Sequence, residues 1–446
     1  MSDSVLVANR GEIARRVIRT VRRLGKRAIA VYSEADAELP FVAEADEAVL
    51  IGPAPAKQSY LNVAAILAAA ASTKAEAIHP GYGFLAENAQ FAAQVIDSGL
   101  IWVGPSPDAI EQMGDKIRAR NLMAAAGVPV APGGAEPVAD AEAAVRLARD
   151  IGYPIMIKAA AGGGGIGMSV AADETQLRSG FETARSRAER FFASPDILLE
   201  RYITSARHVE VQILGLADGR VIALGERDCS VQRRHQKVAE ETPSPGVDAG
   251  LRQRMLQAAV RAGEAVGYQG AGTVECLVDT QTGDFMFLEM NTRLQVEHAV
   301  TEMVTGIDLV EQQLLVAAGA DVSFDPQSVQ LEGHALELRV YAEDPLRFLP
   351  SPGTITQWRE PSGPGVRVDA GYAGGNVVTP HYDPLLAKLV LHGATRDQAI
   401  ALAREAVAEF VITGVKTNLP FHADLLASQE FGGGDYDTSV VSRLRP

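Results

Sequence analysis

The amino-acid sequence predicts an α/β protein of several domains, with α+β organisation in its later part. Its 446 residues are too many for one compact core, so we expect two to four domains. Residues 5–8, 11–25 and 26–33 follow the order strand, helix, strand, which predicts a doubly wound α/β domain up to about residue 114. From about residue 331, short strand-like segments punctuated by proline indicate another mixed α/β domain.

Apolar residues recur on one face of the predicted helix over residues 11–25, at Ile13, Val17 and Val21. The glycine pattern G-x-G-x-x-G does not follow the first strand, which weakens a dinucleotide-binding interpretation of this opening. We expect a second α/β unit, at residues 100–105, to close the first domain.

Three later segments place further elements. Residues 208–213 alternate in polarity and predict an edge strand of the main sheet. Residues 334–345 predict a strand with polar side chains on one side, and residues 397–410 predict a helix.

The composition excludes several classes of function. A net charge of -15 argues against general binding to nucleic acid or to an anionic membrane. The two cysteines, Cys229 and Cys276, provide no disulfide framework and suit a reducing compartment. No signal-peptide pattern and no apolar run long enough to span a bilayer is found. We therefore expect a cytoplasmic protein with no nucleic-acid or membrane partner.

A predicted hairpin brings acidic residues together. Residues 272–278 and 286–291 have strand patterns, with a turn-rich link between them. Glu275 and Glu289 are equally distant from Thr282, so we expect them to be cross-strand neighbours. Strict alternation places Phe287, Glu289 and Asn291 on one face, and Met286, Leu288 and Met290 on the other.

Facing carboxylates repel one another unless a cation lies between them. Asn291 adds a third oxygen beside Glu275 and Glu289. Oxygen ligands of this kind suit Mg²⁺ or Mn²⁺ carrying the phosphates of a nucleotide. The alternative, a solvated outer face of an edge hairpin, fits the hairpin equally well.

The continuation of this segment adds anion-binding chemistry. Arg293, Gln295 and Glu297 keep the period-two spacing, so a guanidinium, an amide and a carboxylate are expected to point the same way. Such a set can hold a small planar oxyanion bidentately and supply a base beside it.

Residues 289–298, Glu-Met-Asn-Thr-Arg-Leu-Gln-Val-Glu-His, resemble the signature of biotin carboxylases, within the ATP-grasp superfamily. Residues 9–14, 79–88 and 226–245 resemble further motifs of the family, so the likeness covers nearly the whole chain. The resemblance implies an ATP-grasp fold. Its expected parts are an N-terminal domain at 1–114, an ATP-grasp domain at 115–330 with a mobile lid at 131–204, and a C-terminal domain at 331–446.

A glycine-rich loop at residues 159–168 follows Lys158. Glycines let backbone N–H groups approach phosphate oxygens, although flexible surface turns share this composition. Lys116 precedes a predicted helix, and without further evidence a lysine at such a position is interpreted as a solvated surface group. Ile166 stands where the family usually has a basic residue, which removes one possible phosphate contact. The resemblance implies that ATP is bound by Lys116, Lys158, Gly163, Gly164, Gly165, Glu200, Arg201, Ile203, His208, Gln232, His235, Glu275, Leu277 and Glu289.

The resemblance also implies the chemistry. Glu275, Glu289 and Asn291 would hold Mg²⁺ or Mn²⁺. Glu297 would deprotonate bicarbonate, whose attack on the γ-phosphorus of ATP forms carboxyphosphate. The expected catalytic residues are Arg293, Glu297, Lys237 and Arg339. The expected bicarbonate-binding residues are Lys237, Arg293, Gln295, Val296 and Glu297, and the expected biotin-binding residues are Tyr82, Gly83 and Arg339.

The expected substrate is biotin on a separate carrier, because the chain has no Ala-Met-Lys-Met biotin attachment segment. The resemblance implies a biotin carboxyl carrier protein or domain and a carboxyltransferase subunit as partners, in the first half-reaction of an acetyl-CoA or other acyl-CoA carboxylase. The resemblance also implies a homodimer, although Arg23 and Pro364 stand where some paired relatives have an acidic and an aromatic residue.

Two other functions stay open at this point. One is an ATP-grasp ligase that activates a different carboxylate through an acyl phosphate, because the phosphate and metal residues would serve it equally. The other is a non-catalytic subunit that binds nucleotide within a larger assembly.

Overall fold

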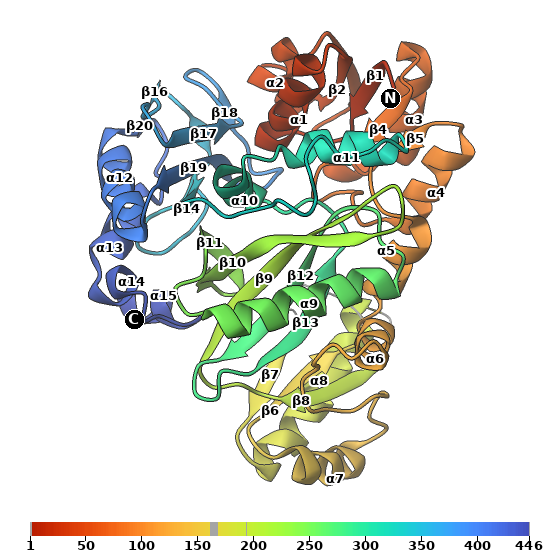
Figure 1. The fold of residues 1–446 in the computed structure, drawn as a ribbon, viewed down its shortest axis with the longest axis vertical. Helices are drawn as coiled ribbons and strands as arrows, with labels where there is room; N and C mark the ends of the chain where they lie inside the picture. The colour runs from red at the N-terminus through yellow and green to blue at the C-terminus, as the bar shows by residue number, and fades with distance from the viewer. Residues whose placement is uncertain (1, 161–167, 193, 446) are drawn as a thin grey trace.

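A computed structural model describes residues 2–160, 168–192 and 194–445. Its N-terminal part is a parallel sheet with the strand order β3-β2-β1-β4-β5 among the described residues (Figure 1). The elements of this part are β1 (Ser4–Val7), α1 (Gly11–Arg23), β2 (Arg27–Ser33), α2 (Pro40–Glu44), β3 (Glu47–Gly52), α3 (Val63–Thr73), β4 (Ala77–His79), α4 (Ala89–Asp97), β5 (Ile101–Trp102) and α5 (Pro107–Gly114).

Alternate residues of β1 enter different hydrophobic clusters. Val5 and Val7 pack with residues of α1, including Val17. Leu6 packs instead with Ile66 of α3 and with residues of α4. Helices therefore cover both faces of the parallel sheet, which confirms the predicted doubly wound domain.

The centre of the molecule is an antiparallel sheet, eight strands wide in the described part of the chain. In spatial order its strands are β13 (Phe285–Asn291), β12 (Gly270–Asp279), β9 (Ala206–Gly215), β10 (Val221–Arg233), β11 (Gln236–Thr242), β14 (His334–Tyr341), β19 (Leu385–Gly393) and β17 (Val366–Ala370). The helices in the same part of the chain as strands β9 to β13, outside the lid, are α6 (Lys116–Ala125), α9 (Ala249–Ala265), α10 (His298–Thr305) and α11 (Leu309–Ala317).

Strand β9 lies between β12 and β10, so the prediction of an edge strand at residues 208–213 is wrong. Every residue of β9 is buried, including His208, Glu210 and Gln212. The polar residues alternate because they point into a buried cluster of charges.

The predicted hairpin is confirmed, since β12 and β13 pair antiparallel with Glu275 opposite Glu289. A bulge follows this pair, because Cys276 faces Phe287 and leaves Leu288 as an extra residue. Phe287 consequently packs in the same buried cluster as Met290. The strict alternation that placed these two side chains on opposite faces is therefore wrong.

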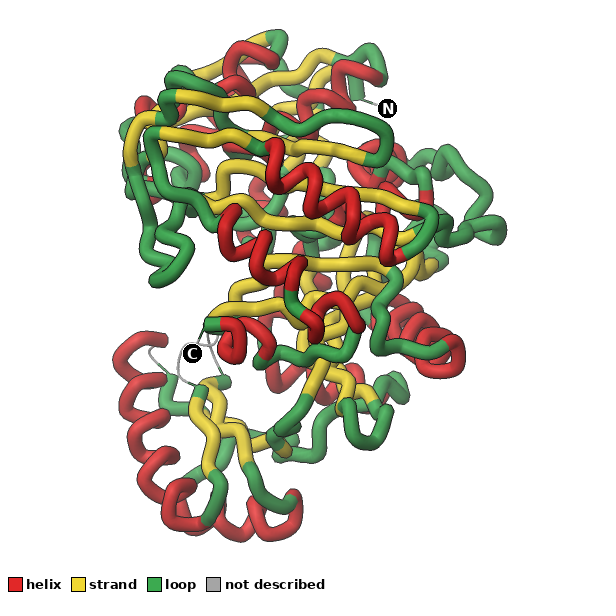
Figure 2. Tube along the Cα trace, turned by 90° about the vertical axis from the view of Figure 1, so that its left-hand side faces the viewer, coloured by secondary structure: helices red, strands yellow, loops and turns green. Residues whose placement is uncertain are grey.

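The segment predicted as a lid is a three-stranded antiparallel sheet in the described residues, ordered β7-β6-β8. It lies at one end of the molecule in both views (Figures 1 and 2) and has its own hydrophobic cluster. Gly163, Gly164, Gly165 and Ile166 lie outside the described residues, and motion of the lid stays a prediction. The elements are α7 (Ala141–Ile151), β6 (Ile155–Ala159), β7 (Ser169–Ala171), α8 (Glu174–Phe192) and β8 (Ile197–Arg201).

The C-terminal part joins the central sheet directly, because β14 pairs with β11. The sheet thus crosses the predicted boundary at residue 330, and the domain limits stay a prediction. The predicted helix at 397–410 is confirmed as α12 (Arg396–Glu409). The remaining elements are β15 (Gly353–Thr354), β16 (Gln357–Arg359), β18 (Val377–Val378), β20 (Val411–Thr413), α13 (Leu419–Ala427), α14 (Gln429–Gly433) and α15 (Val440–Leu444).

No helix within the described residues has the length and apolar character needed to cross a bilayer. The cytoplasmic location stays a prediction.

A buried ion pair fastens the C-terminal helices to the central sheet. Glu241 on β11 accepts hydrogen bonds from Arg396 at 2.7 and 2.9 Å and lies 2.6 Å from His334 Nε2. Burial alone would raise the pKa of Glu241, but His334 and Arg396 lower it to about 2. This carboxylate therefore stabilises the fold above pH 4.5, its ordinary pKa, and the contribution is lost as the pH falls toward 2.

We predict that Arg396→Met lowers the free energy of unfolding by about 3 to 5 kcal/mol at pH 7, because it leaves a buried carboxylate without its bidentate arginine partner. Urea denaturation measures this loss, which should shrink as the pH falls below 4.5. Arg443→Met is the control, because the Arg443–Glu430 pair is exposed and should contribute less than about 1 kcal/mol. Equal losses in the two variants would contradict the prediction.

Candidate active site

A cavity of about 330 Å³ lies between the lid and the central sheet. Lys158, Leu198 and Glu200 line it from the lid, and Arg339 lines it from β14. The other described residues that line it are Lys116, Arg120, Ala131, Met168, His208, Gln232, His235, Gln236, Lys237, Glu275, Phe287, Leu288, Glu289, Asn291, Arg293, Gln295 and Val296.

A tight turn places Lys237 in this cavity. Arg234 and His235 have φ angles of 49° and 68° and join β10 to β11 as a two-residue loop. Positive φ at both loop positions is the geometry that matches the twist of a hairpin. Gln232 and Lys237 consequently face each other across the two strands.

Lys237 donates hydrogen bonds to three carboxylates from different segments. Its Nζ lies 2.5 Å from Glu210 Oε2, 2.8 Å from Glu275 Oε1 and 2.8 Å from Glu297 Oε1. Burial alone would lower the pKa of Lys237, but these acids raise it well above its usual value. The lysine is therefore a permanent cation at the centre of an acidic cluster.

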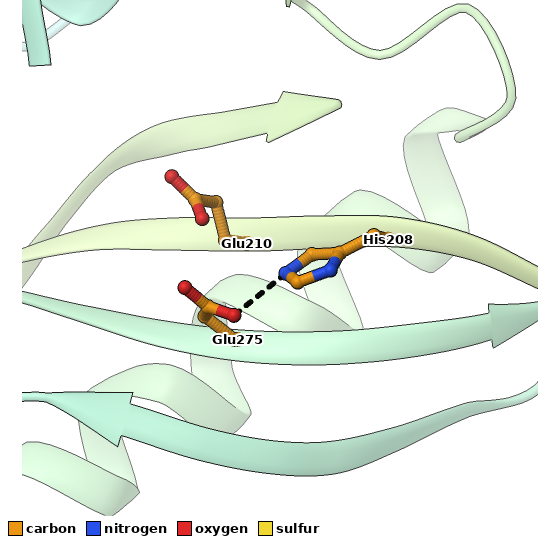
Figure 3. A group of neighbouring side chains, drawn as sticks. All are labelled: His208, Glu210 and Glu275. Atoms are coloured by element: carbon orange, nitrogen blue, oxygen red, sulfur yellow. Dashed lines mark ion pairs between the residues drawn. The ribbon is translucent and has the colours of Figure 1, made fainter. Parts of the chain in front are cut away.

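Figure 3 shows His208, Glu210 and Glu275, which extend from adjacent strands toward one another. Their ligand atoms lie within 4.8 Å of one another, as in a metal centre. Lys237, however, already supplies a cation to both carboxylates. We therefore interpret these three residues as members of a charge network.

The tautomer of His208 follows from its neighbours. Gln232 Nε2 lies 2.8 Å from His208 Nδ1, and an amide nitrogen can only donate. Nδ1 therefore accepts, and the proton is on Nε2, which lies 2.7 Å from Glu275 Oε2. This contact and Lys237 hold the pKa of Glu275 well below its usual range, although burial alone would raise it.

The segment from Arg293 to Glu297 is not extended, since β13 ends at Asn291 and α10 begins at His298. The period-two explanation is therefore wrong, although the side chains do converge. Arg293 Nη1 donates to Gln295 Oε1 at 2.7 Å, and Gln295 Nε2 donates to Glu275 Oε1 at 2.9 Å.

Two further contacts fix the guanidinium of Arg293. Its Nη2 donates to Asn291 Oδ1 at 2.8 Å, and its Nε donates to Glu87 Oε2 at 2.9 Å. Glu87 also accepts from the backbone N–H of Thr292 at 3.1 Å. The N-terminal domain therefore helps to orient a residue of the central cavity.

Glu297 is fully buried beside two cations. In addition to Lys237, Arg339 Nη2 donates to Glu297 Oε2 at 2.9 Å. Burial alone would raise the pKa of Glu297, but Lys237 and Arg339 hold it well below its usual range. The carboxylate is ionised at neutral pH, which is the state that a proton acceptor requires. Arg339 also lies 2.5 Å from Glu240 Oε1.

Tyr82 and Gly83 follow β4 and are not among the described residues that line the cavity. The Tyr82 hydroxyl donates to Glu12, and Asn9 Nδ2 donates to the Tyr82 carbonyl at 2.7 Å. Burial and the charge of Glu12 raise the pKa of Tyr82, while the nearby charge of Arg339 acts to lower it. Gly83 has a φ of +67° and open space on its Cβ side.

The predicted nucleotide residues divide into two groups. Lys116 and Lys158 enter the cavity from different sides, and Lys158 forms an ion pair with Glu200. Burial lowers the pKa of Lys116. The predicted ATP residues that line the cavity are Lys116, Lys158, Glu200, His208, Gln232, His235, Glu275 and Glu289, whereas the described side chains outside its lining are Arg201, Ile203 and Leu277.

The sequence interpretation missed several residues that hold these groups. Glu210 stands two positions after His208 on β9, so its shared face could have been recognised from the period of a strand. Arg227 Nε donates to Glu210 Oε1 at 2.6 Å from its other side. Nothing local in the sequence connects Glu87 to Arg293, because that contact joins two domains.

We predict that Lys237→Met lowers the free energy of unfolding by about 3 to 5 kcal/mol, because three carboxylates lose their shared cation. The loss should be smaller at pH 5 than at pH 8, since proton uptake relieves the repulsion. Thermal or urea unfolding of the ligand-free protein measures it. The double variant with Glu210→Gln should recover part of the stability; no recovery would show that the acids do not repel one another here.

Three family models match successive parts of the chain. The N-terminal domain of biotin carboxylase matches residues 1–110, and the C-terminal domain of biotin carboxylase matches residues 337–443. The ATP binding domain of the carbamoyl-phosphate synthase L chain matches residues 115–324.

Individual proteins are similar over nearly the full length. Biotin carboxylase 2 of Bacillus subtilis is 51% identical over 443 residues, which are 99% of this chain and 100% of that protein. The crystal structure of a biotin carboxylase–beta-gamma-ATP complex from Campylobacter jejuni has a TM-score of 0.96 and 46% identity, covering 99% of both chains.

A third relative is the biotin carboxylase domain dimer of Hydrogenobacter thermophilus 2-oxoglutarate carboxylase, in complex with MgADP, ADP and bicarbonate. Its TM-score is 0.94 at 43% identity, covering 99% of this chain and 98% of that one. The matches confirm the ATP-grasp fold and the resemblance noted in the sequence. The chain belongs to the biotin carboxylase family, whose members are ATP-dependent ligases.

Proposed function

We propose that the protein uses ATP and bicarbonate to carboxylate biotin through carboxyphosphate, the first half-reaction of a biotin-dependent carboxylase. One observation carries this proposal. The ionised, buried Glu297 lies between Lys237 and Arg339, next to the oriented pair Arg293 and Gln295. A base with cations and an amide around it suits a small oxyanion that must be both held and deprotonated.

ATP would lie in the cavity under the lid. Lys116, Lys158 and the glycines at 163–165 would bind its phosphates, and His208, Gln232 and His235 would complete the phosphate end. The adenine base of ATP would be surrounded by Glu200, Arg201, Ile203 and Leu277. The cavity position of the charged residues supports this assignment. Closing of the lid over the nucleotide would exclude water from a reactive mixed anhydride.

The residues present fit a divalent cation. The carboxylate of Glu289 lines the cavity and has no hydrogen bond or ion pair with the side chains of the described residues. Glu275 Oε2 contacts His208 alone, and Asn291 Oδ1 accepts from Arg293 alone within that same part of the chain. Lone pairs therefore remain on all three side chains, and hard oxygen ligands suit Mg²⁺ or Mn²⁺. When bound, the ion would neutralise charge on the transferring phosphoryl group.

Bicarbonate would be held by Lys237, Arg293, Gln295 and the Val296 N–H, with Glu297 taking its proton. The oxygen then attacks the γ-phosphorus, ADP leaves, and carboxyphosphate forms. Lys237 and Arg339 would hold Glu297 in position while it carries that proton. Breakdown of carboxyphosphate would release CO₂ and phosphate inside the closed site.

Biotin would approach the same site from the side of Tyr82 and Gly83. Arg339 would stabilise negative charge on the ureido oxygen, and the released phosphate would take the ureido N–H proton. The ureido nitrogen then forms a bond to the carbon of CO₂. The position of Arg339 against Glu297 supports a biotin ring close to the bicarbonate site.

A biotin carboxyl carrier protein or domain would deliver the biotin, and a carboxyltransferase subunit would take the carboxyl group onward. A homodimer is a further part of the proposal, since a related domain is described as a dimer. That relative belongs to a 2-oxoglutarate carboxylase, so acetyl-CoA, other acyl-CoA molecules and oxoacids are all acceptors to test.

We predict bicarbonate-dependent release of ADP when the protein is given ATP, Mg²⁺ and free biotin, with carboxybiotin as the second product. Coupled assay of ADP and trapping of labelled bicarbonate measure both. Absence of bicarbonate-dependent ADP would reject the proposed function. ADP formed only with another carboxylate would favour a different ATP-grasp ligase, and nucleotide binding without any turnover would favour a non-catalytic subunit.

Arg293→Ala provides the matched test of the site. It should abolish biotin-dependent turnover, because Arg293 orients Gln295 and faces the bicarbonate position. Arg254→Ala is the control, since Arg254 is exposed on α9 and far in sequence from the loop. Full activity of the Arg293 variant would remove this residue from the mechanism.

We predict that Glu289→Gln raises the Mg²⁺ concentration needed for half-maximal turnover by about 10-fold or more, because it removes one anionic ligand. Asp284→Asn, in the turn of the same hairpin, should leave that concentration unchanged. Titration of Mg²⁺ or Mn²⁺ at saturating ATP compares the two. An unchanged requirement in the Glu289 variant would exclude Glu289 as a ligand.

A further inference from the structure

Lys388 on β19 is a fully buried lysine close to, but outside, the described lining of the cavity. Its Nζ donates to the carbonyl oxygen of Val296 at 2.7 Å and lies 3.3 Å from Glu12 Oε2. The Val296 carbonyl shares its peptide plane with the N–H of Glu297. One ammonium group therefore fixes the backbone at the residue proposed as the base.

Glu12 connects the same lysine to a second loop. It lies in the first turn of α1 and accepts a hydrogen bond from the hydroxyl of Tyr82. The contacts thus run from the Val296 carbonyl through Lys388 and Glu12 to Tyr82. They join the loop proposed to hold bicarbonate to the loop proposed to hold biotin.

The sheet register also places Lys388 beside Arg339, the residue proposed to stabilise charge on the ureido oxygen of biotin. On β19, Lys388 is paired with Arg339 of the neighbouring strand β14 and with Asp369 of the other neighbour, β17. Burial alone would lower the pKa of Lys388, but Glu12, Glu337 and Asp369 raise it above its usual value. The side chain is therefore charged at neutral pH, donates a hydrogen bond to the Val296 carbonyl and forms an ion pair with Glu12.

A second contact fixes the preceding peptide. The carbonyl oxygen of Gln295 lies 2.7 Å from His298 Nδ1, which must donate because a carbonyl only accepts. This peptide carries the Val296 N–H. Lys388 and His298 thus hold two successive peptide planes, and Lys388 also connects them to the Tyr82 loop through Glu12.

We propose that Lys388 is a positioning residue that sets the distance between the bicarbonate loop and the biotin loop. This role rests on the proposed function. Lys388 does not touch the reacting atoms; it determines how much of the activated carboxyl group reaches biotin and how much is lost to water. Misplacement of reacting groups by about 1 Å can reduce a rate by about 100-fold.

The experiment compares two activities of Lys388→Met in the full-length protein. One is bicarbonate-dependent ADP release without biotin, and the other is carboxybiotin formed per ADP released with biotin present. We expect the ratio of carboxybiotin to ADP to fall by about 10- to 100-fold. The KM for ATP should stay within about twofold of the wild-type value, which is a difference of less than about 0.5 kcal/mol.

Arg396→Met is the control, because it also removes a buried cation from an ion pair but lies away from the cavity. It should lose stability and keep the wild-type ratio. Glu12→Gln is the second variant, since it keeps the shape of the link and loses only its charge. It should lower the ratio in the same direction even if the Lys388 variant fails to fold.

An unchanged ratio in a folded Lys388→Met or Glu12→Gln protein would overturn the proposal. An equal fall in ADP release and in carboxybiotin formation, which leaves their ratio constant, would also overturn it, since that is the behaviour of a purely structural residue. These outcomes differ from failure of the proposed function, in which the wild-type protein itself shows no bicarbonate-dependent ADP release.

Discussion

The ammonium group of Lys237 and the carboxylates of Glu210, Glu275 and Glu297 constrain the whole centre of the molecule. Each acid comes from a different segment, namely β9, β12 and the residues before α10. Buried carboxylates cannot remain charged side by side without a cation, so these segments must bring their acids to one point. Arg227 and Arg339 offset the remaining negative charge from opposite sides. The contacts that join these segments are therefore the same contacts that keep Glu297 ionised.

Local patterns predicted the elements whose contacts are local. The apolar face of α1 and the symmetry of Glu275 and Glu289 about Thr282 both follow from spacing within a short segment, and the structure confirms them. The bulge beside Leu288 and the interior position of β9 depend on partners that lie far away in the sequence. Polar alternation cannot distinguish a strand facing water from one facing buried counter-charges, because both contain the same residue types.

The candidate site shows the same limit more sharply. Arg293, Gln295 and Glu297 were recognised from residue type and from the family signature, although a turn brings them together where a strand was expected. The supporting residues Glu87 and Lys388 come from opposite ends of the chain. No spacing rule connects such positions, since each contact exists only after three parts of the protein have packed together. Recognition of chemistry was therefore easier than recognition of the groups that orient it.

The pairing of β11 with β14 makes one sheet out of strands from the central and C-terminal parts. A fragment that stops before β14 would expose the backbone N–H and C=O groups of β11 as an open edge, next to apolar side chains such as Val238 and Ala239. Edges of this kind recruit strands from other chains and lead to aggregation. Shortened versions of this protein should consequently retain β14, β19 and β17, so that β11 keeps its pairing with β14.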